Sequence, residues 1–305
     1  MRLHGWMIGE LAALGAAVSW AIAPILYRKA LSNTKPISAN IVRCATSAAV
    51  LAGVLVLLGK VGALANLPVG VVIVTVVSAL IGLGIGDTLY MIGLKSLGVA
   101  RAVPLAATYP LFSLVWAMFL LGQPLSLTAV LGAAVILLGI WLLSREKSEE
   151  NDRVKGKLVF MGVVVSLVTA VVWSVSVTLM NVAVSMSSTN SLDANYAILT
   201  VRMGAIALFL MLLTPFIDRE HGFLKMKRRT VIELCVGGLV ANGIGWLLMN
   251  YSFLTIVEAR AVPISSISPL FTVVAGFIFF HEKLSTKTVL GAITIVAGVS
   301  LIFLV

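Results

Sequence analysis

Residues 100–104 read ARAVP, and residues 259–263 read ARAVP again, 159 positions later. Three further motifs recur at this offset: PLF at 110–112 and 269–271, LS at 125–126 and 284–285, and VLGA at 130–133 and 289–292. Upstream, Arg43 matches Arg202 at the same offset. The agreement of several motifs at one offset indicates that the chain is an internal duplication.

The composition indicates that the solvent of this chain is a lipid bilayer. Apolar residues make up 60% of the 305 positions and charged residues only 11%, whereas soluble domains contain roughly 25% charged residues. A membrane-spanning helix needs about 20 apolar residues, and continuous apolar segments favour helices over barrel strands, which alternate. We predict spans at 8–28, 38–59, 69–94, 100–121, 127–144, 158–181, 196–217, 230–253, 259–280 and 285–304.

Each half of the duplication contains five predicted spans, and an odd number places the two halves in opposite orientations. Inverted repeats of this kind are a recurring architecture of secondary transporters. The sequence therefore predicts an all-α membrane protein of ten transmembrane helices in two inverted five-helix repeats. The first repeat covers 1–144, a charged linker covers 145–157, and the second repeat covers 158–305.

The order of motifs in each half resembles the EamA-type repeat of the drug/metabolite transporter superfamily. In both halves ARAVP is followed by PLF, then by GQPLS at 122–126 or HEKLS at 281–285, and then by VLGA. The resemblance covers nearly the whole chain. It implies a central cavity formed largely by the first, third, fourth, sixth, eighth and ninth helices, with export or exchange of amino acids, metabolites or drug-like compounds. Gln123 departs from the usual glutamate, which the second half retains as Glu282, and this difference favours a structural role for Glu282.

Ionisable side chains within predicted spans are functional candidates, because a charge at a helix centre costs about 2.5–3.5 kcal/mol on insertion scales. Asp87 either couples protons or binds a cationic group, or it is a structural acid paired with a helix neighbour or with Arg43. Its repeat equivalent is Trp246, so the acid is not a symmetric framework element. The symmetry of Arg43 and Arg202 favours framework residues that extend to the head groups. Binding of a substrate carboxylate is the alternative.

Prolines, aromatic residues and amides provide the other candidates for the lining of a substrate cavity. Prolines within a helix remove a backbone donor and produce a kink, and paired broken helices often mark a transporter's site. The proline-associated candidates are Pro104, Tyr109, Pro110, Pro263, Ser266 and Pro269. The aromatic and amide candidates are Trp20, Tyr90, Trp173, Asn242, Trp246 and Asn250. Plain helix packing is the alternative interpretation for each of them.

Several function classes are disfavoured by what the sequence lacks. His4, His221 and His281 fall at span ends or in loops, which does not suit an intramembrane enzyme. No phosphate-binding loop motif is present, so we do not expect ATP-driven transport by this chain alone. Cys44 and Cys235 read as small buried apolar residues, and we expect no disulfide, metal or cofactor. A non-transporting membrane scaffold or sensor remains the competing hypothesis.

The net charge of +10 arises from basic residues in the predicted loops, so we expect anionic lipids as partners and no nucleic acid. We also expect a small-molecule substrate, with proton coupling as one option, and a multi-pass location in the plasma membrane. Loop charges place both termini outside by the positive-inside rule, whereas the family resemblance implies termini inside. The orientation, the substrate and the oligomeric state stay open at this point.

Overall fold

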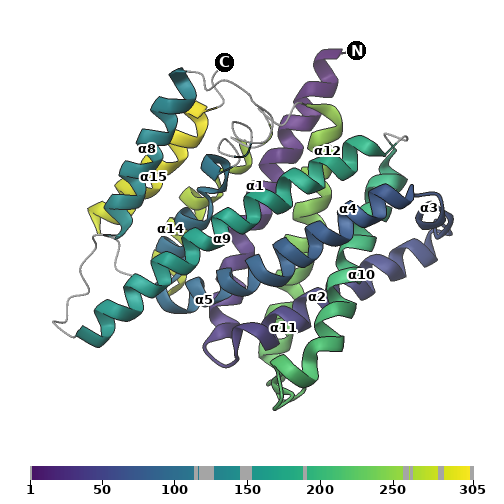
Figure 1. Cartoon of the computed structure of the whole chain (residues 1–305), viewed down its shortest axis with the longest axis horizontal. Coiled ribbons are helices and arrows are strands. Elements are labelled where there is room, and N and C mark those ends of the chain that lie inside the picture. Colours follow the sequence, from purple (N-terminus) through teal and green to yellow (C-terminus); the bar gives the residue numbers. More distant parts are fainter. Residues whose placement is uncertain are drawn as a thin grey trace.

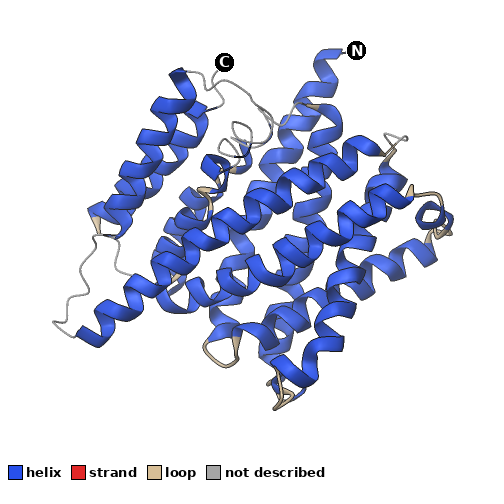
Figure 2. Cartoon of the chain, in the orientation of Figure 1, coloured by secondary structure: helices blue, strands red, loops and turns tan. Residues whose placement is uncertain are grey.

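The computed structural model describes residues 2–112, 116, 127–144, 153–187, 191–256, 261, 264–280 and 285–302. Within these ranges the chain consists of helices and short loops, without a strand (Figure 2). Six segments are long and apolar enough to cross a membrane: Met7–Leu31, Pro36–Leu57, Val69–Leu97, Leu158–Met186, Leu192–Ile217 and Arg228–Thr255. Three described apolar helices are shorter. The all-helical class is therefore confirmed, while the count of ten spans in two repeats stays a prediction.

The helices of the first predicted half begin with a long α1 and end with α8 (Figure 1). Their bounds are α1 (Arg2–Leu31), α2 (Pro36–Leu57), α3 (Gly62–Ala65), α4 (Val69–Ala79), η1 (Leu80–Gly86), α5 (Asp87–Leu97), α6 (Val99–Ala106) and α8 (Leu127–Ser144). Those of the second are α9 (Arg153–Met186), α10 (Leu192–Ile217), η2 (Gly222–Leu224), α11 (Arg228–Gly238), η3 (Leu239–Gly245), α12 (Trp246–Thr255), α14 (Ser268–Phe280) and α15 (Thr286–Ile302).

Two π-helical segments occupy equivalent positions in the duplicated sequence. The segment η1 reads LIGLGIG and η3 reads LVANGIG, and their first residues, Leu80 and Leu239, are 159 positions apart. Each segment continues directly into an α-helix, at Asp87 in the first half and at Trp246 in the second. Such π segments within helices are rare and occur frequently at functional sites.

The ARAVP helices are interrupted between their two prolines, as the prolines predict. In the first half α6 ends at Ala106, a turn follows at 107–108, and helical structure resumes at Tyr109. In the second half the equivalent turn lies at 266–267, directly before α14. The hydroxyl of Thr108 donates to the carbonyl oxygen of Leu105 at 2.7 Å, which satisfies a carbonyl next to the break.

The helices α8 and α15 pack side by side and antiparallel, on the left of Figure 1. Glycines make this close approach possible. A Cβ atom on Gly132 would lie 2.7 Å from the carbonyl oxygen of Gly298, and one on Gly139 would lie 2.9 Å from that of Gly291. Gly132 and Gly291 are repeat equivalents, as are Gly139 and Gly298, so each pair joins unlike members of the two halves. This reciprocity is the contact pattern of a two-fold interface.

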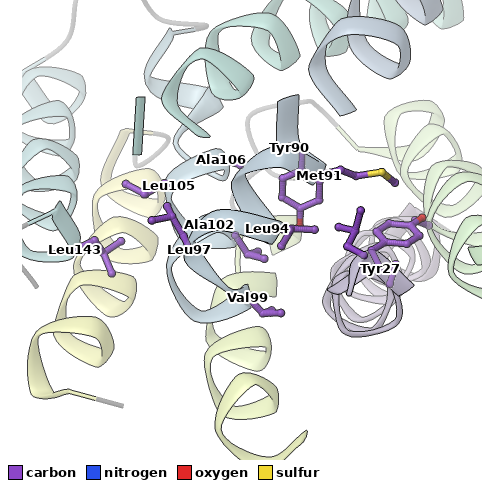
Figure 3. Close-up of a cluster of buried hydrophobic side chains, with 14 of the residues drawn as sticks. Tyr27, Tyr90, Met91, Leu94, Leu97, Val99, Ala102, Leu105, Ala106 and Leu143 are labelled. Carbon is purple, nitrogen blue, oxygen red and sulfur yellow. The ribbon is translucent and has the colours of Figure 1, made fainter. Parts of the chain in front are cut away.

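The largest apolar cluster lies between the two predicted halves. Figure 3 shows part of it, with side chains from α1, α5, α6 and α8, among them Tyr27, Met91, Leu105 and Leu143. Large apolar side chains are also exposed along the outer faces of the long helices, for example Leu212, which is 67% exposed. Such a surface suits a hydrocarbon solvent, since lipid tails are as apolar as leucine.

An ion pair at one end of the bundle provides a test of surface electrostatics. Lys35 Nζ lies 2.7 Å from Glu220 Oε2, and both side chains are exposed. This hydrogen bond raises the pKa of Lys35 above its ordinary value of 10.5 and lowers the pKa of Glu220 below 4.5. The glutamate's contribution to stability is therefore lost as the pH falls through its lowered pKa, and the lysine's is lost as the pH rises through its raised pKa.

We expect Lys35→Gln to change the thermal midpoint of the purified protein only slightly, because exposed ion pairs contribute little. The difference should be confined to the range between the two pKa values and should vanish at high salt, because salt screens exposed charges. Melting curves at low and high ionic strength across pH would check this. A large difference that persists at high salt would contradict it.

Candidate functional site

A cavity of about 110 Å³ lies where the two predicted halves meet. Its wall includes residues of η1 and η3 and of the helices on either side of these segments. The lining residues are Trp20, Ala23, Pro24, Tyr27, Arg43, Gly82, Leu83, Asp87, Tyr90, Val103, Ala107, Tyr109, Trp173, Ser176, Val177, Arg202, Ala241, Asn242, Trp246, Ser265, Ser266 and Ser268. The cavity is thus bounded by both halves and is rich in aromatic rings.

A buried network holds the ion pair of the first half in the cavity wall. Arg43 Nη2 donates to Asp87 Oδ2, and the exposed fractions of the two side chains are 3% and 7%. Arg43 Nε donates to Asn40 Oδ1 at 2.9 Å, and Arg43 Nη1 donates to the Tyr27 hydroxyl at 3.2 Å. The Tyr27 hydroxyl in turn donates to the carbonyl oxygen of Gly237 in α11. The network therefore connects α1, α2, α5 and α11.

The π segment η1 is tied into the same network. Asn40 Nδ2 donates to the carbonyl oxygen of Leu83 at 2.8 Å and to Thr88 Oγ1 at 2.9 Å. A π-helical segment displaces carbonyls from the regular α-helical pattern, so a side-chain donor of this kind stabilises it. Asn40 therefore contacts both Arg43, the partner of Asp87, and the π segment after which Asp87 lies.

Two tryptophans each reach across to a glycine of the other half. Trp173 Nε1 donates to Asp87 Oδ1 at 2.8 Å, and a Cβ atom on Gly86 would lie 2.7 Å from the Trp173 ring. Trp20 Nε1 donates to the carbonyl oxygen of Ala241 at 3.3 Å, and a Cβ atom on Gly245 would lie 2.7 Å from the Trp20 ring. Only glycine permits these approaches. The contacts are reciprocal, because the glycines are equivalent at offset 159 and the tryptophans occupy corresponding first and sixth predicted spans.

The arginine of the second half has different surroundings. Arg202 is 1% exposed, and its guanidinium carbon lies 3.8 Å from the centre of the Trp246 ring. Its Nη2 donates to Ser176 Oγ at 3.0 Å, whereas Nε and Nη1 have no hydrogen-bond acceptor among the residues that the structure describes. Stacking on tryptophan stabilises a desolvated cation by about 2 kcal/mol, which is less than a buried counter-ion can provide.

The structure brings many of the predicted site residues together around this cavity. The lining contains Trp20, Arg43, Asp87, Tyr90, Tyr109, Trp173, Arg202, Asn242, Trp246 and Ser266. Pro104, Pro110, Asn250 and Pro269 lie outside the lining, and Asn250 is fully buried in α12. Pro263 and Glu282 lie outside the described residues.

The expectation that the two arginines extend to the head groups is wrong. Arg43 and Arg202 are 2% and 1% exposed, and both border the cavity. The reason is that each finds a partner inside the bundle, Asp87 for Arg43 and the Trp246 ring for Arg202. Of the interpretations that the sequence left open for Asp87, the structure contains the ion pair with Arg43.

Tyr27 and Ser176 are among the lining residues that were not predicted as candidates. Tyr27 lies seven positions after Trp20, and Ser176 lies three positions after Trp173. Helical residues at these spacings share a face, so the faces that carry the two tryptophans could have predicted both. Ser176 also exchanges hydrogen bonds with Ser78, each hydroxyl donating to the other's carbonyl oxygen at 2.8 Å.

Comparison with known protein families agrees with this architecture. The model of the EamA-like transporter family matches the chain twice, at residues 7–145 and at residues 160–304. The chain belongs to the EamA-like transporter family. A transporter of uncharacterized function from Archaeoglobus fulgidus is 28% identical over 305 residues, which covers 98% of this EamA-like chain and 99% of that protein.

Solved structures share the fold of this EamA-like chain. In one of them, a crystal structure of a protein, the chain is similar with a TM-score of 0.66 and 18% sequence identity. The match covers 96% of this chain and 95% of that chain. The family and the apolar helices together identify the molecule as a multi-pass membrane protein and a transporter.

Proposed function

We propose that this EamA-like protein is a secondary transporter that exports or exchanges small metabolites, amino acids or drug-like compounds by alternating access. In this proposal ten helices form two inverted repeats, and the cavity between them is the substrate site. The observation that carries the proposal is the cavity itself, which is lined by both halves at the equivalent segments η1 and η3.

The reciprocal contacts between the halves support a rocking mechanism. Trp20 packs on Gly245 and Trp173 packs on Gly86, so two related contacts lie between the halves beside the cavity. Two inverted repeats can exchange their conformations, and in this proposal the two contacts, both formed in this structure, separate in turn as the cavity opens to one side and then to the other. The tryptophans are suited to this because a flat ring can separate from a glycine surface while the helices that carry the ring and the glycine stay intact.

Asp87 is the residue that we propose for coupling. Its carboxylate accepts hydrogen bonds from Arg43 and Trp173, which belong to different halves. Protonation would weaken both interactions, because a neutral carboxyl group no longer pairs with the guanidinium. The protonation state of Asp87 would therefore influence how firmly the two halves are joined at the cavity.

Counterflow in proteoliposomes tests this function. Vesicles loaded with pooled unlabelled amino acids, organic acids and cationic dyes should take up labelled members of the same pools, and wild-type uptake should change with pH. Asp87→Asn keeps the shape and one acceptor oxygen, so we expect a folded protein whose residual uptake is independent of pH. Exposed Arg229→Gln serves as a control, because Arg229 lies at the start of α11 and is absent from the cavity lining.

The outcomes separate the competing hypotheses. Unchanged, pH-dependent uptake by Asp87→Asn would return Asp87 to a structural role while leaving transport intact. Absence of exchange for every pool, in protein that is monodisperse, would contradict the transport proposal and favour a membrane scaffold or sensor.

A further inference from the structure

The guanidinium of Arg202 is the least satisfied polar group in the cavity wall. Nε and Nη1 carry three of the five guanidinium N–H donors, and within the described part of the chain neither atom has an acceptor. Among the described residues no carboxylate pairs with it, and its face is covered by the Trp246 ring. A buried, unpaired cation is costly in a membrane, so such a residue is a functional candidate.

Arg43, the repeat equivalent of Arg202, shows which hydrogen-bond acceptors Arg202 lacks among the described residues. Arg43 has Asn40, Tyr27 and Asp87 as acceptors for its three nitrogen atoms. The position that Asp87 occupies in the first half is occupied by Trp246 in the second. The first half therefore contains an acid paired with its arginine, whereas no acid among the described residues of the second half pairs with Arg202.

The charges and hydrogen-bonding groups of the cavity wall indicate which kind of ligand it can bind. Among the described lining residues the ionised groups are Arg43, Asp87 and Arg202, and the first two neutralise each other. One positive charge remains. Among the described lining residues, the buried polar atoms without a hydrogen-bond partner are Arg202 Nε, Arg202 Nη1 and Asn242 Nδ2, and all three are donors. A ligand that satisfies this wall must carry one negative charge and accept hydrogen bonds.

We propose that Arg202 is the anion-binding residue of the cavity and that the transported solutes are small organic monocarboxylates. The inference rests on the proposed transport function and specifies its substrate class. A carboxylate fits better than a phosphate ester, which carries a charge of about −1.5 to −2 near pH 7 and would leave excess negative charge in a desolvated site. Guanidinium groups stack through their faces and donate through their edges, so Trp246 and a carboxylate can contact Arg202 together.

Matched pairs of acids and amides test the proposal with the full chain in proteoliposomes. The pairs are acetate and acetamide, hexanoate and hexanamide, and phenylacetate and phenylacetamide, with phenyl phosphate as the dianion. Wild-type counterflow should favour the acid over its amide by about tenfold or more, as expected for a hydrogen bond to a charged group. Arg202→Met should abolish this preference. The variant should fold, because it removes an unpaired buried charge and retains much of the side-chain volume.

A second pair of variants tests the repeat argument. Trp246→Asp places a carboxylate at the position equivalent to Asp87, where it should pair with Arg202 and exclude the substrate acid. Trp246→Asn introduces a side chain of nearly the same shape as aspartate but without the charge. We expect the acid preference to be lost in Trp246→Asp and retained in Trp246→Asn, a difference that a merely structural role for Arg202 would not produce.

Binding to protein in detergent distinguishes failure of this inference from failure of the transport proposal. At least one of the three acids should raise the unfolding temperature of the wild type but not that of Arg202→Met. If the wild type exchanges other solutes while none of the acids is preferred or stabilising, the monocarboxylate assignment is wrong and transport stands. If no solute is exchanged but an acid stabilises only the wild type, Arg202 is an anion site in a protein that does not transport. Stronger stabilisation by phenyl phosphate than by any acid would overturn the carboxylate class.

Discussion

Replacement of Asp87 by alanine is expected to reduce the stability of the folded transporter by about 3–5 kcal/mol, the usual effect of removing one partner of a buried ion pair. The change leaves the Arg43 guanidinium without its counter-ion at 2% exposure. It also removes the acceptor of Trp173 Nε1, which comes from the other half of the chain. The loss should appear as a lower unfolding temperature in detergent and a smaller monodisperse fraction after heating.

A double variant separates the charge effect from general damage to the core. Arg43→Met together with Asp87→Leu replaces both ions by apolar side chains, and such replacements of a buried pair are often neutral or stabilising. The double variant should therefore be more stable than Asp87→Ala while lacking pH-dependent transport. If the double variant is as unstable as the single one, the ion pair is not the source of the loss.

Much of the architecture was predictable because a bilayer imposes strong constraints on sequence. Long apolar segments identify helices without reference to tertiary structure, and the described helices begin and end close to the predicted spans, as with 36–57 against 38–59. The break between Pro104 and Pro110 was also predictable, since proline affects the backbone locally. The π-helical form of η1 and η3 was not, because it depends on tertiary partners such as the Asn40 amide.

The candidate site was predictable as a set of residues but not as a set of interactions. Burial cost alone identified Asp87, and repetition identified Arg43 and Arg202. The partners of the arginines could not be derived, because Trp246 and Arg202 are 44 positions apart and meet only when α10 packs against α12. The offset of 159 nevertheless related Asp87 to Trp246. This equivalence explains why Arg43 has a paired acid while Arg202 has none among the described residues.

Leucine at Gly298 is expected to separate α8 from α15 and to cost about 3 kcal/mol or more, at the upper end of overpacking effects in well-packed cores. A Cβ atom at this position would lie 2.8 Å from the backbone nitrogen of Ile136 and 2.9 Å from the carbonyl oxygen of Gly132. Backbone atoms cannot rotate away as a side chain can, so the whole helix pair must move. Alanine should already cost about 1–3 kcal/mol for the same reason.

Gly204 provides the matched control for this prediction. It lies within α10, and beyond its own stretch of helix a Cβ atom there would meet none of the described atoms within 4 Å. Gly204→Leu should therefore leave stability unchanged or slightly higher, since glycine within a helix is less favourable than other residues by about 0.5–1 kcal/mol. Unfolding temperatures of both leucine variants in the same detergent decide the matter. Equal stability of the two variants would mean that α8 and α15 do not approach each other through their glycines. The two-fold contact between the halves would then be wrong as well.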